Sequence, residues 1–279
     1  MLFIAIIIGL GYVFDYVWGV PGTYSGVWFA IILSLIMTSI SYFSGDKIAL
    51  SVSGAKQISK EENSYLYNMV ENLCITAGAP MPKIYIIEDG AINAFATGRK
   101  PELASIAVTR GALEKLENEE LEGVLAHELS HIKNYDIRFM MLVAVLVGAI
   151  AIMSDIFIRS RLFGGRRDSD NNGNAGAILM IVGIVLAILS PIIAELIKLA
   201  ISRKREYLAD ASGSLLTRYP EGLARALEKI RDENLPMRSA SKATAHLFIA
   251  SPFSGKKISG LFYTHPPIEE RIKQLRQMA

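Results

Sequence analysis

The chain has 279 residues, 51% of them hydrophobic, and a formal net charge of +2 at pH 7. This length suits one or two domains, and the near-neutral charge gives no whole-chain attraction to nucleic acid, so no nucleic-acid partner is expected. Because Cys74 is the only cysteine, an internal disulfide and a zinc site built on cysteine are excluded. Cys74 lies in the apolar stretch NLCITAGAP and is expected to be a small buried hydrophobic residue.

Two apolar runs begin the chain. Residues 2–19 contain one charge, Asp15, and residues 26–43 contain none. Each run has about the length of a helix that crosses the hydrocarbon core of a bilayer, and the link VPGTYS starts with a turn-forming Pro-Gly pair. We predict a transmembrane hairpin at residues 1–43. A cleaved signal peptide fits less well, because no Lys or Arg precedes the first run.

The block 44–138 has an ordinary globular composition. Residues 61–78 space their apolar side chains like a helix with one buried face, and Gly78 and Pro80 follow as stop signals. Three β-branched or alternating stretches read as strands, at 83–89, 92–98 and 105–111. We expect them to form a small antiparallel sheet packed on helices.

The next helix is predicted to begin at Asn118, a residue type that favours the N-cap position. The acidic residues that follow it suit the positive end of the helix dipole. Since no proline occurs from 118 to 158, the helix is expected to continue directly into a third apolar run, 139–158.

The stretch HELSH lies inside this helix. His127 and His131 are four residues apart, so both imidazoles project to the same side and can bind one metal ion. Glu128 then lies beside the ion, where a base takes a proton from a water that zinc activates. Two solvent-facing histidines are the plainer alternative, but histidine is rare here and the flanking positions are apolar. The sequence therefore predicts one zinc ion per chain.

The region 139–199 contains the last two apolar runs. Residues 139–158 and 176–199 flank a loop rich in Gly, Asn, Asp and Ser, and read as a second membrane hairpin. Lysines follow the 26–43 run while the first hairpin turn has none, so the positive-inside rule places residues 44–138 in the cytoplasm. If both later runs cross fully, the arginines of the second loop lie outside, against that rule; a hairpin that does not cross fully is the alternative.

A catalytic zinc site needs a third protein ligand and one open position. The candidates are Asp136, Glu195, Glu206, Asp210, His246 and His265. In KREYLADASG, Glu206 and Asp210 are four apart among apolar residues, and buried acids need partners. Glu206 as the ligand and Asp210 as acceptor for a histidine N–H would satisfy both. A solvated face paired with Arg203 and Arg205 is the alternative.

The order of these motifs resembles one family. HELSH after ENEELEGVLA, then an apolar hairpin, then EYLAD and THPPIEER, is similar to the HtpX-type membrane zinc metalloproteases, which are relatives of the CAAX prenyl proteases. The resemblance covers nearly the whole chain. It implies an α+β, mainly helical integral membrane protein, with four hydrophobic helical segments and a gluzincin-like metalloprotease domain that contains a small β-sheet and the HExxH helix. The abrupt start at Met1 departs from the family and leaves the length of the first span open.

The resemblance also implies roles for individual residues. His127, His131 and Glu206 would bind zinc, Glu128 would be the general base, and Asp210 would support a ligand histidine. His265 and Arg271 would stabilise the oxyanion of the tetrahedral intermediate. The stretch NAFATG resembles the family's substrate-side strand, so Asn93 and Ala94 would bind an extended peptide through the main chain.

These observations predict a zinc-dependent endopeptidase of a bacterial inner membrane, multi-pass, with its active site facing the cytoplasm. Its partners would be the lipid bilayer and misfolded or membrane polypeptides, cleaved as proteolytic quality control. The predicted parts are a membrane hairpin at 1–43, protease segments at 44–138 and 200–279, and a second membrane hairpin at 139–199. Two alternatives remain open: a narrow-specificity processing peptidase, and a non-catalytic membrane scaffold with structural zinc. Glu128 argues against the scaffold, because a structural site has no use for a base there.

Overall fold

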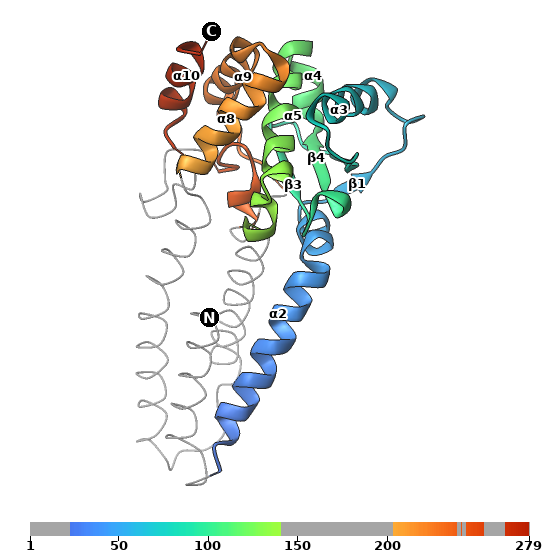
Figure 1. Cartoon of the computed structure of the whole chain (residues 1–279), viewed down its shortest axis with the longest axis vertical. Helices are drawn as coiled ribbons and strands as arrows, with labels where there is room; N and C mark the ends of the chain where they lie inside the picture. The colour runs from blue at the N-terminus through green and yellow to red at the C-terminus, as the bar shows by residue number, and fades with distance from the viewer. Residues whose placement is uncertain (1–22, 141–202, 239–240, 242–243, 254–265, 279) are drawn as a thin grey trace, which may run out of the picture. The chain divides into compact units, whose positions relative to one another are not determined.

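The computed structural model describes residues 23–140, 203–238, 241, 244–253 and 266–278 (Figure 1). The chain divides into two compact units, Met1–Phe43 with Leu146–Ile193, and Ser44–Val145 with Ala194–Ala279. The second unit contains the sheet and the helices that build the candidate site. The predicted four-part division of the chain stays a prediction.

Helix α2, Ser25–Val52, contains the second apolar run. None of the helices in the described residues combines the length and the apolar character that a membrane crossing requires. The runs 2–19 and 176–199 lie outside the described residues, as does the run 139–158 from residue 141 onward. Four membrane-spanning helices therefore stay a prediction.

The second unit contains a four-stranded sheet with the strand order β1-β2-β4-β3. Its strands are β1 (Ala55–Gln57), β2 (Lys83–Ile87), β3 (Ala94–Thr97) and β4 (Ser105–Thr109). The three predicted strands are confirmed, whereas the three-residue β1 is too short for its pattern to be recognised. The expectation of an antiparallel sheet is wrong for one pair, because β2 and β4 run parallel. β4 is buried at every position, as suits a central strand covered on both faces.

Helices on the sheet follow local signals. The predicted helix at 61–78 is confirmed as α3, Ser64–Ala77: the Asn63 side chain accepts from the Leu66 N–H at 3.0 Å, and Gly78 closes it with a left-handed φ of 62°. Cys74, on this helix, is 4% exposed, which confirms that it is buried. The short helices η1 (Pro101–Leu103) and α4 (Arg110–Lys115) flank β4.

Helix α5, Asn118–Lys133, contains HELSH and begins at the predicted residue, but Asn118 is not its N-cap and its predicted C-terminal continuation is wrong. Its N-cap is Glu117, in a capping box with Glu120, while the Asn118 side chain accepts a hydrogen bond from Tyr65 Oη at 2.9 Å. The helix does not continue into the third apolar run. Asn134 caps it, and Tyr135 adopts a left-handed φ of 60° before helical backbone resumes.

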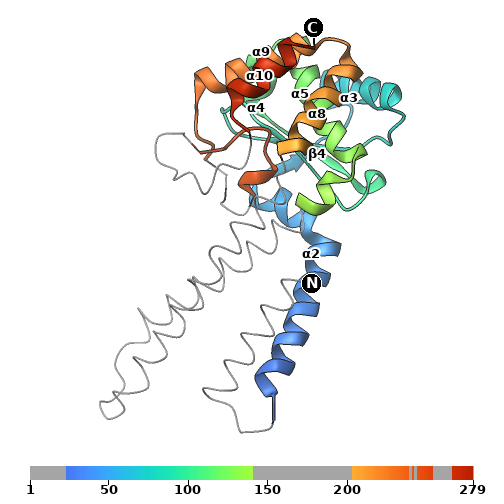
Figure 2. The same ribbon diagram turned by 60° about the vertical axis from the view of Figure 1, so that its left-hand side comes forward.

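The C-terminal half supplies α8 (Arg203–Thr217), α9 (Pro220–Glu233), η2 (Ala245–Leu247) and α10 (Ile268–Arg276). Helix α5 contacts α3 and β3 on one side and α8 and α9 on the other (Figures 1 and 2). Two glycines allow this close packing. A Cβ on Gly123 would lie 2.7 Å from the Leu223 backbone nitrogen in α9, and one on Gly213 of α8 would lie 2.9 Å from the backbone nitrogen of His127.

Candidate metal centre

Helices α5 and α8 bring His127, His131 and Glu206 together inside the protein. Their exposed fractions are 0%, 4% and 0%. The two histidine Nε2 atoms lie 3.2 Å apart, and Glu206 carboxylate oxygens lie 3.9 Å from the Nε2 of His127 and 3.6 Å from that of His131. One donor atom from each residue falls within 4.8 Å of the others, so the cluster could hold a metal ion.

Each histidine ring is fixed by a carboxylate on its other nitrogen. The Nδ1 of His127 lies 2.9 Å from Asp210 Oδ1, and the Nδ1 of His131 lies 3.1 Å from Asp136 Oδ2. An Nδ1–H that donates to a carboxylate leaves a lone pair on Nε2, which is the form that binds a metal. Both Nε2 atoms lie inside the cluster, because each is within 4 Å of the other and of a Glu206 oxygen.

Asp136 is the residue whose role the sequence left undecided among six candidate ligands. In an unbroken helix, a residue five positions after His131 would lie roughly 140° around the axis. The break at Asn134 and Tyr135 instead brings Asp136 back against His131. Arg205 holds it there, with Nη1 2.6 Å from Asp136 Oδ1.

Arg271 is buried, with 1% of its surface exposed, and forms two hydrogen bonds with Asp210. Its Nε and Nη2 donate to the two carboxylate oxygens at 2.9 and 2.7 Å, and its Nη1 donates to the Ile249 carbonyl at 3.0 Å. Burial alone would raise the pKa of Asp210, but the charge and hydrogen bonds of Arg271 lower it to about 2. The carboxylate that fixes His127 is therefore ionised.

Glu128 lies next to the cluster on the α5 helix and is 1% exposed. Burial raises the pKa of its carboxyl group to about 8, although a hydrogen bond from the Ala96 backbone and the nearby His131 act in the opposite direction. Within the described residues, its Oε1 has no hydrogen-bond partner. In its ionised form, this group has a free acceptor atom that can take a proton from a bound water.

The carboxylates around His131 favour positive charge at its ring, whereas burial lowers the pKa of His127 to about 4. Burial lowers the pKa of His131, but the hydrogen bond to Asp136 and the charges of Glu206 and Glu128 raise it to about 9. The negative groups thus stabilise positive charge at this ring, which a divalent ion would supply. Two imidazoles and one carboxylate, all buried, form the donor set of a zinc or similar transition-metal site with an open position.

The other residues that the sequence singled out either lie away from the cluster or lie outside the described residues. Glu195 and His265 lie outside the described residues. His246 is buried in η2, and its Nε2 lies 3.0 Å from the Met140 carbonyl rather than in the cluster. Asn93 and Ala94 lie at the start of β3 and are only 3% and 0% exposed.

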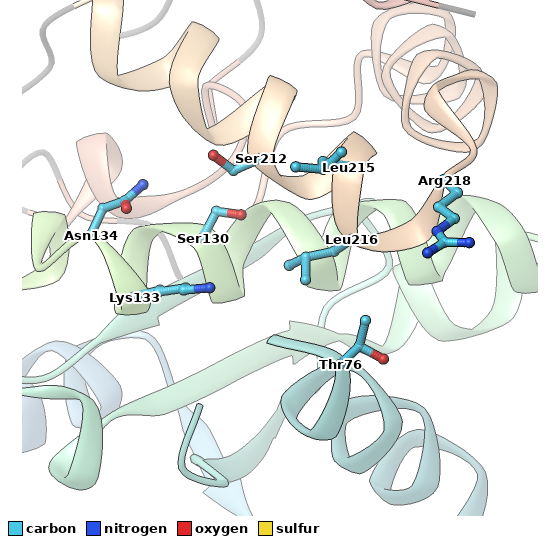
Figure 3. Close-up of a pocket in the computed structure, with 8 residues that line it drawn as sticks. All are labelled: Thr76, Ser130, Lys133, Asn134, Ser212, Leu215, Leu216 and Arg218. Atoms are coloured by element: carbon cyan, nitrogen blue, oxygen red, sulfur yellow. The ribbon is translucent and has the colours of Figure 1, made fainter. Parts of the chain in front are cut away.

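A cavity of about 360 Å³ lies near the C-terminal ends of α3, α5 and α8 (Figure 3). Thr76, Ser130, Lys133, Ser212 and Leu216 contribute to its walls. None of the three clustered residues lines it, so this hollow is separate from the candidate metal centre.

Comparisons with a family model and with individual proteins point to the same family. A model of peptidase family M48 matches residues 60–279. A protease HtpX homolog of Caldanaerobacter subterraneus subsp. tengcongensis is 47% identical over 280 residues, which cover 100% of this chain and 92% of that protein. A protease HtpX homolog of Streptococcus gordonii is 42% identical over 280 residues, covering 99% of this chain and 94% of that protein.

A solved structure shares the fold. The crystal structure of Ste24p from S. mikatae matches with a TM-score of 0.55 at 20% sequence identity. The match covers 96% of this chain and 62% of that one. The α+β fold of this chain, a small sheet packed with helices, is therefore similar to that of a solved structure.

Proposed function

The chain belongs to peptidase family M48, among its HtpX-type proteases, and is a metalloendopeptidase. We propose that it is a zinc-dependent enzyme that cleaves misfolded or membrane polypeptides. The observation that carries the proposal is the buried cluster of His127, His131 and Glu206 with Glu128 beside it. These three residues would hold one zinc ion per chain. A zinc ion bound there would supply Lewis-acid chemistry, by lowering the pKa of a water and polarising the peptide carbonyl.

The protein's own groups divide the remaining work. Glu128 takes the proton of the attacking water on its carboxylate and passes it to the leaving amine. Asp210 and Asp136 hold the two imidazoles by their Nδ1 atoms, which would leave each Nε2 available to bind the ion. Ala94, the first residue of β3, and Asn93, just before it, would bind the substrate main chain.

Arg271 and His265 were both expected at the oxyanion. Three donors of the Arg271 guanidinium already bind Asp210 and the Ile249 carbonyl. We therefore assign Arg271 a positioning role through Asp210, and keep His265 as the donor that stabilises the oxyanion.

The proposed location is the bacterial inner membrane, with the active site facing the cytoplasm. The support is the four uncharged or nearly uncharged runs and the lysines that follow the second run. Membrane fractionation tests this: the chain should stay with the membranes in alkaline carbonate and leave them only in detergent.

The substrate scope separates the proposal from a narrow processing peptidase. The detergent-purified enzyme should cleave several unrelated unfolded proteins and leave their folded forms intact, because β3 recognises main chain rather than sequence. Electrophoresis and mass spectrometry of the products make the measurement. Cleavage of a single terminal motif, with every unfolded protein left intact, would support the processing peptidase instead.

A further inference from the structure

A segment from the C-terminal half occupies the outer edge of β3. One edge of β3 pairs with β4, and across the other edge Phe248 forms an antiparallel bridge with Phe95. The Ile249 N–H donates to the Ala94 carbonyl at 2.9 Å. The Phe95 and Phe248 rings meet edge to face, with centroids 4.9 Å apart. Residues 247–250, here called the edge segment, thus lie on β3 like a short added strand.

The same edge leads to the catalytic base. The backbone of Ala96, two residues after Ala94, lies near enough to the Glu128 carboxyl group to lower its pKa. Arg271 Nη1 donates to the Ile249 carbonyl of the edge segment at 3.0 Å. An extended peptide that pairs with β3 and reaches Glu128 has only this edge to use, because β4 covers the other one.

We propose that the edge segment occupies the place of the substrate on β3, and that a polypeptide must displace it before cleavage. The inference rests on the proposed function. It adds that the edge segment controls the access of a polypeptide to the proposed active site. The incoming strand would take over the Ala94 carbonyl. It would also take over the Asn93 Nδ2, which now donates to the Ala250 carbonyl at 3.1 Å.

The burial of the edge segment indicates what can replace it. Phe248 and Ile249 are 0% and 1% exposed, so leaving their pockets empty is costly. A substrate strand offsets this cost only if it brings its own large apolar side chain to the position of Phe248. Unfolded segments rich in aromatic or branched apolar residues meet this condition, whereas polar or folded chains do not.

A reversible disulfide across the bridge tests the proposal. Phe95 and Phe248 form a non-hydrogen-bonded antiparallel pair, because the flanking Ile249 N–H bonds to Ala94. Cα atoms in such pairs lie about 4.5 Å apart, within the range of a disulfide. The full-length variant Phe95→Cys/Phe248→Cys is made with Cys74→Ala, so that no third thiol is present. Oxidised, it should keep its zinc but cleave an unfolded protein at least tenfold more slowly than the same sample after reduction.

The Cys74→Ala protein without the pair is the matched control, and its activity should not respond to oxidation. If that control cleaves nothing, the proposed function fails and not the edge-segment inference. Equal cleavage by the oxidised and reduced pair variant would overturn the inference, because a locked strand cannot be displaced.

Hydrogen exchange covers the case in which the pair variant is inactive in both states. In Glu128→Gln protein, saturation with an unfolded protein should speed amide exchange in the edge segment, since the Ile249 N–H loses its acceptor. Unchanged or slower exchange there would overturn the inference without any cleavage assay.

Discussion

Asp210 and Asp136 fix the two histidine rings by the same contact but reach it by different routes. Asp210 follows Glu206 by one helical turn, so its direction could be predicted from spacing alone. Asp136 comes into place only because α5 ends at Lys133 and the chain turns at Tyr135. The break in the helix after Lys133 thus places the second carboxylate that fixes a histidine of the candidate metal centre.

Substitution of Asp136 tests this support. Asp136→Ala should weaken zinc affinity by about 10- to 100-fold, the usual effect of removing a ligand histidine's partner. Asp136→Asn should have a smaller effect, because its amide oxygen still accepts from Nδ1. Chelator competition measures both affinities.

Asp232→Ala is the control for the same change at an exposed site, since Asp232 pairs with Arg231 at the surface. It should leave zinc affinity unchanged. Unaltered affinity in Asp136→Ala as well would contradict the positioning role of Asp136.

Packing between α5 and α8 sets the distance between the histidines and Glu206. Gly213 allows the approach, because any Cβ there would meet the α5 backbone at His127. Backbone cannot yield as a flexible side chain can, so the helices would have to separate.

Gly213→Ala should therefore lower both the free energy of unfolding, by about 1–3 kcal/mol, and the affinity for zinc. Gly90→Ala is a matched control, since a Cβ at Gly90 meets nothing within 4 Å. Denaturant titration and chelator competition give the two readouts. Wild-type zinc affinity in Gly213→Ala would show that helix separation does not set the site.

Sequence patterns were sufficient where the determinants are local. The C-terminal end of α3, the strands β2, β3 and β4, and the i, i+4 pairs in HELSH and EYLAD needed only neighbouring residues. The parallel pairing of β2 with β4, the contact of Arg271 with Ile249 and the edge segment on β3 join distant parts of the chain. No periodicity carries that information, so these features required the structure.

The two halves of the folded unit meet at the metal centre, because α5 and α8 come from opposite sides of the region 141–202. A zinc ion bound by both helices would join the halves. Ligand binding to the native state alone stabilises it by about 4 kcal/mol when the free ligand is a thousandfold above its dissociation constant.

Removal of the metal should therefore lower the apparent melting temperature of the detergent-solubilised protein as well as stop cleavage. Dialysis against a chelator followed by zinc addition should restore both properties. Thermal scans monitored by circular dichroism make the comparison. An unchanged melting temperature after verified zinc loss would show that the metal does not join the halves.

We propose that HELSH forms the active site of a zinc peptidase. The most direct measurement compares cleavage of an unfolded model protein by wild type and Glu128→Gln, with bound zinc quantified in each. We predict about one zinc per chain in both proteins and at least a hundredfold slower cleavage by Glu128→Gln, the loss expected for a general base. Cleavage by Glu128→Gln at the wild-type rate would contradict the account.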